Sequence, residues 1–70
     1  MTNLKRIRQA QNMSQGALAE RAGVSLRSLQ NYEQGHKDIN KTQALTLYKI
    51  AQALNCPIED LLEIKKEVEE

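Results

Sequence analysis

The chain has 70 residues, of which 40% are hydrophobic and 27% charged, and its formal net charge is +1. This length allows one domain at most, and the composition is typical of a globular rather than a disordered segment. A single Cys excludes an internal disulfide, and one Cys with one His does not supply a four-ligand zinc site.

The side-chain inventory also disfavours catalysis. His36 is the only imidazole, and it lies in a polar segment that is typical of a loop. The three glycines are scattered and form no phosphate-binding loop. We therefore expect a protein that is not an enzyme, with no catalytic residue, metal, cofactor or small-molecule ligand. No signal segment opens the chain and no apolar run approaches the ~18 residues of a membrane span, so we expect a cytoplasmic protein without membrane contact.

Charge is distributed unevenly along the chain. Residues 1–49 carry eight Lys or Arg and three acids, whereas residues 50–70 carry two Lys and six acids. A basic body with an acidic end is typical of a surface that faces a polyanion. We assign residues 1–64 to one domain and residues 65–70 to an acidic C-terminal tail, either a frayed helix end or a solvated segment.

Helix caps and a 3.6-residue apolar period predict an all-α fold, a compact bundle of five helices without strands. The first three helices are short and separated by brief turns. Their expected ranges, with the capping residues, are 2–11 (Thr2 or Asn3), 15–22 (Ser14) and 26–34 (Ser25). Gly23 and Gly35 stand where a left-handed residue ends a helix, and Asn12 and Asn55 stand at similar places.

Two more helices are predicted in the second half of the chain. The fourth starts at Asn40 or Thr42 and continues to about Leu54, after a polar connection that Ile39 pins to the core. Pro57 opens the fifth helix, whose first turn contains two acids. The core side of the fourth helix is expected to hold Ala44, Leu47, Tyr48, Ala51 and Leu54, widened by Ile50.

The third predicted helix has two different sides. Leu29, Tyr32 and Glu33 fall on the side that we expect to be buried. The opposite side holds Arg27, Gln30, Asn31 and Gln34. Arg pairs with guanine, and Asn or Gln pairs with adenine, in the major groove of DNA. This side therefore predicts base recognition, and the alternative is an ordinary solvated helix face.

Glu33 is a charged residue on an otherwise apolar side. A buried carboxylate needs a partner, because its desolvation costs several kcal/mol. Arg8, on the inward side of the first helix, is the natural candidate. We predict an Arg8–Glu33 ion pair, the alternative being that Glu33 reaches solvent.

Short motifs in a fixed order extend this interpretation. Residues 14–35 form a helix, a tight turn containing Gly23, and a second helix. The motifs include Leu4-Lys5-Arg6-Ile7-Arg8, Met13-Ser14-Gln15, Ala22-Gly23-Val24-Ser25, Tyr32-Glu33-Gln34-Gly35 and Glu59-Asp60-Leu61-Leu62. From Leu4 to about Leu62 the chain resembles the phage-repressor/Cro-type (XRE-like) helix-turn-helix family. The resemblance implies a lambda-repressor-like five-helix bundle whose third helix enters the major groove of operator DNA.

The resemblance, together with the polar side of the third helix, suggests roles for individual residues. Base recognition is expected from Leu26, Arg27, Gln30 and Asn31, and phosphate contact from Ser14, Gln15, Ser25, Ser28, Lys37 and Lys41. Arg8 and Glu33 match the internal ion pair of the family. Leu26 either contacts a thymine methyl or belongs to the core beside the cap. The connection over residues 35–42 is longer than usual in the family.

These observations predict a sequence-specific regulator of transcription that binds double-stranded DNA as a repressor. A homodimer on a two-fold symmetric operator is expected, with subunit contacts at Leu45, Cys56, Ile58 or Ile64. Cys56 is otherwise a buried filler or, less simply, a redox sensor. The alternatives are a protein-interaction module on the same scaffold, a DNA-binding antitoxin or restriction-modification controller, and a fragment of a longer regulator.

Overall fold

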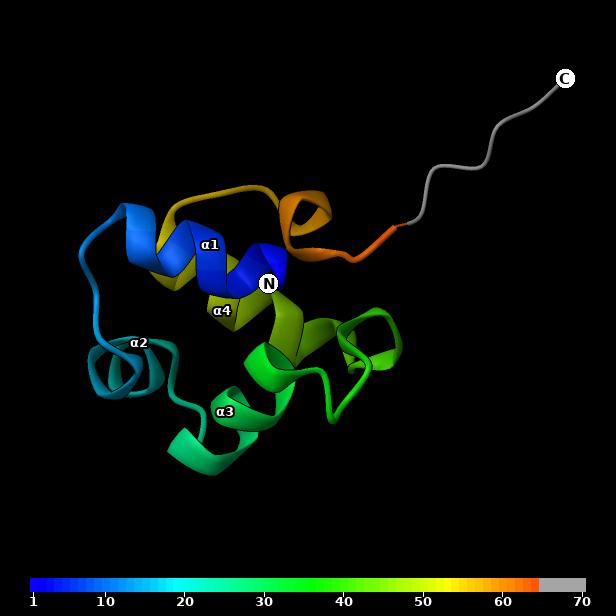
Figure 1. Cartoon of the computed structure of the whole chain (residues 1–70), viewed down its shortest axis with the longest axis horizontal. Helices are drawn as coiled ribbons and strands as arrows, with labels where there is room; N and C mark the ends of the chain where they lie inside the picture. Colours follow the sequence, from blue (N-terminus) through cyan, green and yellow to red (C-terminus); the bar gives the residue numbers. More distant parts are fainter. Residues whose placement is uncertain (65–70) are drawn as a thin grey trace, which may run out of the picture.

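The computed structural model describes residues 1–64, and the predicted acidic tail over residues 65–70 lies outside the described residues. All regular secondary structure of the described part is helical, which confirms the all-α class (Figure 1). Its elements are α1 (Asn3–Ala10), α2 (Gln15–Ala22), α3 (Leu26–Gln34), the 3₁₀ turn η1 (Ile39–Lys41), α4 (Ala44–Leu54) and the 3₁₀ turn η2 (Ile58–Leu61).

The first three helices begin and end where their caps predict. Thr2, Ser14 and Ser25 each accept a hydrogen bond from a backbone N–H of the first turn. Such a side-chain cap contributes about 1 kcal/mol to the stability of a helix. Gly23 and Gly35 end α2 and α3 in the left-handed conformation, with φ of 72° and 81°. Asn12 has positive φ, as the sequence predicts, and Asn55, which ends α4, also has positive φ.

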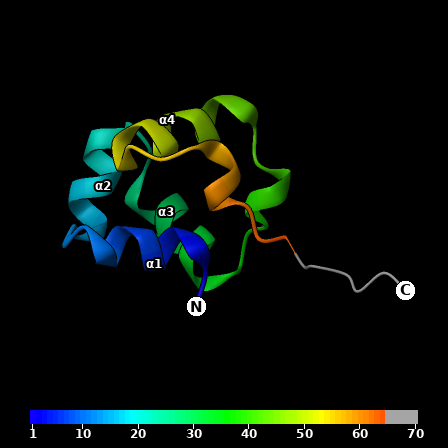
Figure 2. The same cartoon turned by 90° about the horizontal axis from the view of Figure 1, so that it is seen from above.

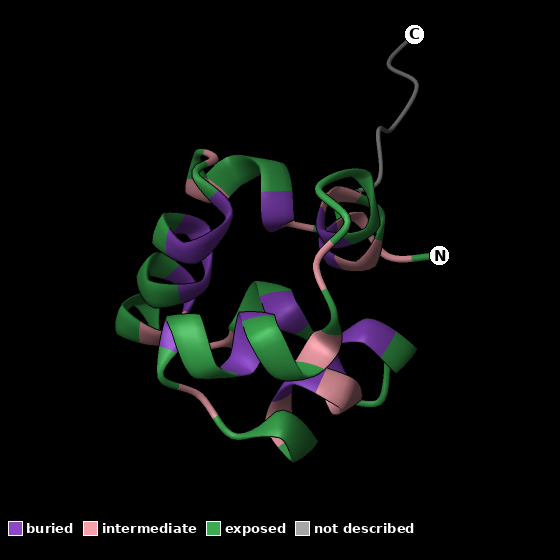
Figure 3. Ribbon diagram, turned by 90° about the vertical axis from the view of Figure 1, so that its left-hand side faces the viewer, coloured by how far each residue is buried: buried purple, intermediate pink, exposed green. Residues whose placement is uncertain are grey.

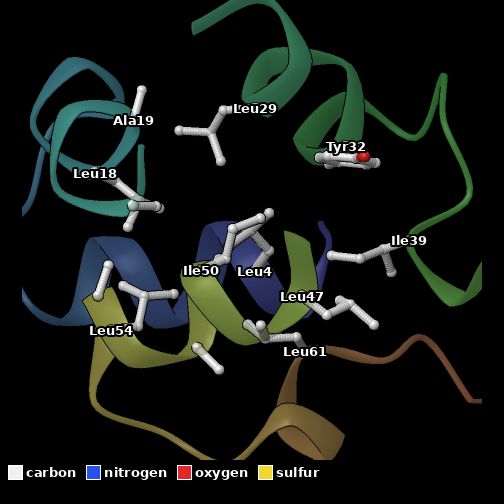
Figure 4. Packing of buried hydrophobic residues seen from close by; sticks show 13 residues of the cluster. Leu4, Leu18, Ala19, Leu29, Tyr32, Ile39, Leu47, Ile50, Leu54 and Leu61 are labelled. Atoms are coloured by element: carbon white, nitrogen blue, oxygen red, sulfur yellow. The ribbon is translucent and has the colours of Figure 1, made fainter. Parts of the chain in front are cut away.

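The core lies where the four helices and η2 meet (Figure 4). Six large side chains in it are fully buried: Leu4, Leu18, Leu29, Ile50, Leu54 and Leu61. Burial of each contributes roughly 1.5–3 kcal/mol. Ile39 is buried with them and anchors η1, as expected. The buried residues face inward from every helix and the outer faces are exposed (Figure 3), so the polar side of α3 is left open to solvent.

The prediction of a fifth helix after Pro57 is wrong. Pro57 precedes only the four-residue 3₁₀ turn η2, and Leu62 is already extended, with ψ of 146°. Backbone groups that a helix would need here bind distant side chains instead. The Leu62 carbonyl accepts from Asn3 Nδ2, and the Glu63 N–H donates to Asn40 Oδ1. The chain therefore leaves the core in an extended conformation.

The fourth helix also differs from its prediction. It begins at Ala44, because Asn40 belongs to η1 and Thr42 is extended. The apolar period predicts Ala44 and Tyr48 in the core, yet Ala44 is exposed and Tyr48 is 52% exposed. The buried arc of α4 is centred on Ile50 and Leu54 and extends to Ala53, so it is rotated away from Tyr48.

Candidate nucleic-acid interface

The turn between α2 and α3 determines which side of α3 faces solvent. Gly23 ends α2, Val24 packs partly buried against the core, and Ser25 caps α3. Leu29, Tyr32 and Glu33 are buried, as predicted. On the opposite side, Arg27 and Gln34 are exposed and Gln30 and Asn31 are half-buried. Leu26 is 44% exposed, which excludes the core role considered for it and leaves its side chain available for an apolar contact.

Glu33 is the only acid of α3, and it is held inside the molecule. Arg8 forms the expected ion pair with it, through Nε to Oε2 at 2.6 Å and Nη2 to Oε1 at 3.0 Å. Arg8 Nη1 also donates to the Met13 carbonyl at 2.7 Å, so the guanidinium holds α3, α1 and the α1–α2 connection together. Two parallel hydrogen bonds of this kind fix both position and orientation. The exposed side of α3 consequently carries one cation and no carboxylate.

Two glutamines connect this ion pair to the outer side of α3. Gln15 Nε2 donates to Glu33 Oε1 at 2.9 Å, and Gln15 Oε1 accepts from Gln30 Nε2 at 3.4 Å. The carboxylate thus sets which end of the Gln15 amide is the donor, and Gln15 in turn orients Gln30. Within residues 1–64, Gln30 Oε1 and the second N–H of the Gln30 amide have no hydrogen-bond partner. Nothing in the periodicity of the sequence signals these contacts.

Three serines predicted to contact phosphate differ in what their hydroxyls already do. Ser14 Oγ accepts from Ala17 N at 3.0 Å as the cap of α2. Ser25 Oγ accepts from Ser28 N at 3.1 Å and donates to Ser28 Oγ at 2.9 Å. The hydroxyls of Ser25 and Ser28 are thus paired with each other, whereas that of Ser14 caps α2.

The two predicted phosphate-binding lysines lie in the connection that follows α3. Lys37 and Lys41 are both exposed, and Lys37 Nζ stands 6.0 Å from the centre of the Tyr32 ring. The start of the connection is bound to the end of α3, because His36 N and Lys37 N both donate to the Asn31 carbonyl. The backbone of Lys37 is therefore bound to the end of α3, whereas Lys41 lies in η1.

The residues expected at a subunit contact are not equally accessible. Leu45 and Ile64 are 62% and 68% exposed, but Cys56 and Ile58 are half-buried against the core. Tyr48 adds a second exposed apolar side chain to α4, beside an open hollow of about 550 Å³ that Arg21 and Lys49 also border. Burial, with a smaller contribution from Asp60, raises the pKa of the Cys56 thiol. A raised pKa argues against a reactive redox sensor.

Within residues 1–64, no helix is long and apolar enough to cross a membrane, and no group of three or more His, Cys, Asp or Glu is placed to hold a metal.

Comparison with known proteins identifies the family. The helix-turn-helix family matches residues 4–61, most of the chain, and the chain therefore belongs to this Cro-type (XRE-like) helix-turn-helix family. A relative from Rhodospirillum rubrum, an uncharacterized transcriptional regulator in the ATPase CF(0) region, is 41% identical over 58 residues. That alignment covers 79% of this chain and 51% of the relative, so the chain spans about half the length of that protein. No solved structure matches the chain.

Proposed function

We propose that this protein is a sequence-specific repressor that inserts α3 into the major groove of double-stranded DNA and binds a two-fold symmetric operator as a homodimer. The observation that carries the proposal is the outer side of α3. It presents Arg27, Gln30 and Asn31 while its one carboxylate, Glu33, is only 5% exposed and paired with Arg8. Such a surface suits the donors and acceptors of base edges and avoids repulsion from phosphates.

We assign base recognition to three polar side chains and one apolar side chain. Arg27 is exposed at the start of α3, where it suits the two acceptors of guanine. Asn31 suits adenine, and so does Gln30, whose free Oε1 and second N–H match the donor and acceptor of that base. Leu26 is exposed beside Arg27 and suits a thymine methyl group. Each bidentate contact is worth about 1–3 kcal/mol of discrimination.

Phosphate contacts would fix the position of α3 on the duplex. Ser14 and Gln15 stand at the N-terminus of α2, where free backbone N–H groups and the helix dipole favour an anion. Gln15 retains one N–H beyond its bond to Glu33. We assign further phosphate contacts to Ser28 and to the exposed lysines Lys37 and Lys41. These contacts carry no sequence information but supply much of the affinity.

The small size of the domain supports the proposal of a dimer. A single α3 contacts few base pairs, and two copies on half-sites about 10 base pairs apart double the number read. Leu45 on the outer face of α4 is the exposed apolar side chain that we assign to the subunit contact. Occlusion of a promoter by the bound dimer would repress transcription. The Rhodospirillum rubrum relative is itself described as a transcriptional regulator, which supports the assignment.

A binding titration tests the proposal. Fluorescence anisotropy of a labelled 20-base-pair duplex pool is expected to show affinity that falls steeply with salt, with a logarithmic slope of about −0.9 per phosphate contact. On a duplex enriched from that pool, Arg27→Ala is expected to weaken binding by roughly 5- to 150-fold. Arg21→Ala, which removes an exposed arginine beside α4, is the matched control and should change little. No salt-sensitive binding at low salt would favour a protein-interaction module instead.

A further inference from the structure

Three polar side chains from distant parts of the chain meet at one corner of the molecule, outside the surface assigned to base recognition. They are Asn3 at the start of α1, Asn40 in η1 and Glu63 after η2. Figure 2 shows the segment that follows η2 passing the connection that carries η1. Asn3 Nδ2 donates to the Leu62 carbonyl at 2.8 Å, and Asn3 N donates to the Glu63 carboxylate.

Asn40 makes the most specific contacts at this corner. Its Nδ2 donates to the Glu63 carbonyl at 2.9 Å, and its Oδ1 accepts from the Glu63 N–H at 2.8 Å. The amide thereby pairs with both backbone groups of one residue, as a neighbouring β-strand would. Its own N–H donates to Asp38 Oδ1 at 2.9 Å, which caps η1. Asn40 thus binds η1 on one side and the C-terminal segment on the other.

The same short connection carries both lysines that we assign to phosphate contact. Lys37 and Lys41 flank Asn40 in sequence, and Lys41 N donates to the Asp38 carbonyl at 3.0 Å within η1. Ile39 anchors the connection in the core, and the bonds of His36 N and Lys37 N to the Asn31 carbonyl fasten its start to α3. The two hydrogen bonds of Asn40 add an attachment at η1, on the side of the C-terminal segment. Chain segments held in their binding conformation lose less entropy when they bind.

We infer that Asn40 is a positioning residue for DNA binding: by pairing with the Glu63 backbone it holds the connection that presents Lys37 and Lys41 to the phosphates. The inference rests on the proposed function. Asn40 need not touch DNA, and its side chain is occupied by Glu63.

The test uses non-specific binding, because phosphate contacts do not depend on sequence. The probe is a labelled 20-base-pair duplex of arbitrary sequence, titrated by anisotropy over a series of salt concentrations. Asn40→Ala is expected to weaken binding about three- to tenfold and to make the salt slope shallower by up to about 0.9 per lost phosphate contact. Asn3→Ala is the matched control, since it removes a hydrogen bond to the same segment without touching the connection. The control should leave the salt slope unchanged, and thermal unfolding of each variant ensures that folded protein is compared.

The decisive comparison repeats Asn40→Ala in a protein that already carries Lys37→Ala and Lys41→Ala. If Asn40 acts through the lysines, the substitution has no further effect on affinity in that background. An equal loss in both backgrounds, or no loss in either, would overturn the inference while leaving the proposed function intact. So would a double lysine variant that binds as well as the wild type. A wild-type protein that does not bind the duplex at low salt would instead overturn the proposed function and the inference together.

Discussion

Helices α3 and α4 are both amphipathic, but each has residues that do not fit an apolar inner side and a polar outer side, and these residues lie on opposite sides of the two helices. In α3 the exception is inside: the buried side contains a carboxylate, and the outer side is polar and free of acids. In α4 the exception is outside: the buried side is entirely apolar, and the outer side exposes Leu45 and Tyr48. Each helix places on its outer side the chemistry that suits a different partner, a polyanion for α3 and an apolar surface for α4.

Under the proposed function, this difference assigns two separate tasks to the two helices. A helix that faces phosphates benefits from having no exposed carboxylate, and burying Glu33 against Arg8 achieves this while joining α1 to α3. A buried ion pair is seldom more stabilising than apolar residues of similar size, but it is costly to break. We therefore expect substitutions in α3 and α4 to separate stability, DNA binding and self-association.

Breaking the Arg8–Glu33 ion pair should have the largest effect, a loss of free energy of unfolding. Glu33→Ala leaves the Arg8 guanidinium buried without its carboxylate, and such losses cost about 3–5 kcal/mol. A domain of this size is worth about 3–5 kcal/mol in total, so urea denaturation should find the variant largely unfolded. Glu20→Ala, at an exposed position of α2, is the control and should stay within about 0.5 kcal/mol of the wild type. A fully stable Glu33→Ala protein would show that the pair is dispensable.

The outer side of α4 should respond in association rather than stability. Leu45→Glu places a charge in the proposed subunit contact and is expected to weaken the dimer about tenfold or more, measured by sedimentation equilibrium. Gln9→Glu makes the same change in charge at an exposed position of α1 and should leave association unchanged. If both variants associate as the wild type does, Leu45 lies outside the subunit contact.

The N-terminus of α2 allows stability and DNA binding to be separated at one residue. Ser14→Ala removes the cap and should lower the free energy of unfolding by about 1 kcal/mol. Ser14→Asp keeps a capping oxygen and should preserve stability, yet it should weaken DNA binding because a carboxylate then faces the phosphates. Chemical denaturation and anisotropy titrations measure the two effects. Unchanged DNA affinity in Ser14→Asp would exclude Ser14 from the phosphate-binding surface.

Cys56, just beyond α4, should show the smallest effect. Burial and Asp60 raise the pKa of its thiol, so the folded state holds the thiol proton more tightly than the unfolded state does. Any stability from this difference is present below the thiol pKa of the unfolded chain and declines as pH rises above it. At a pH near 8, iodoacetamide should modify the folded protein more slowly than the protein in urea. Faster modification of the folded protein would contradict the pKa direction and restore the redox alternative.

The parts of the fold that follow from neighbouring residues were predictable. The bounds of α2 and α3 depend on capping residues that act within one helical turn of their own positions, namely Ser14, Gly23, Ser25 and Gly35. The Arg8–Glu33 pair was predictable too, because a charge on an apolar helix side demands a partner and the opposing helix offered one.

Other features depend on contacts between distant residues, which a local pattern does not contain. The apolar period of a helix does not by itself determine which of its residues lie at the centre of the buried side. In the structure, the buried side of α4 is turned away from Tyr48. The predicted fifth helix failed because Asn3 and Asn40 bind the backbone groups that it needed. The family resemblance places Gln15 at the phosphate surface, but its bond to Glu33 has no counterpart in the sequence pattern.

The central claim is that the outer side of α3 recognises bases. Selection of duplexes from a random pool by the wild-type protein and by Asn31→Ala, each followed by sequencing, tests it most directly. The wild type should enrich a two-fold symmetric motif with half-sites about 10 base pairs apart, and Asn31→Ala should lose preference at one position of each half-site. An identical motif from both proteins, or retention of DNA without any enriched motif, would contradict the claim.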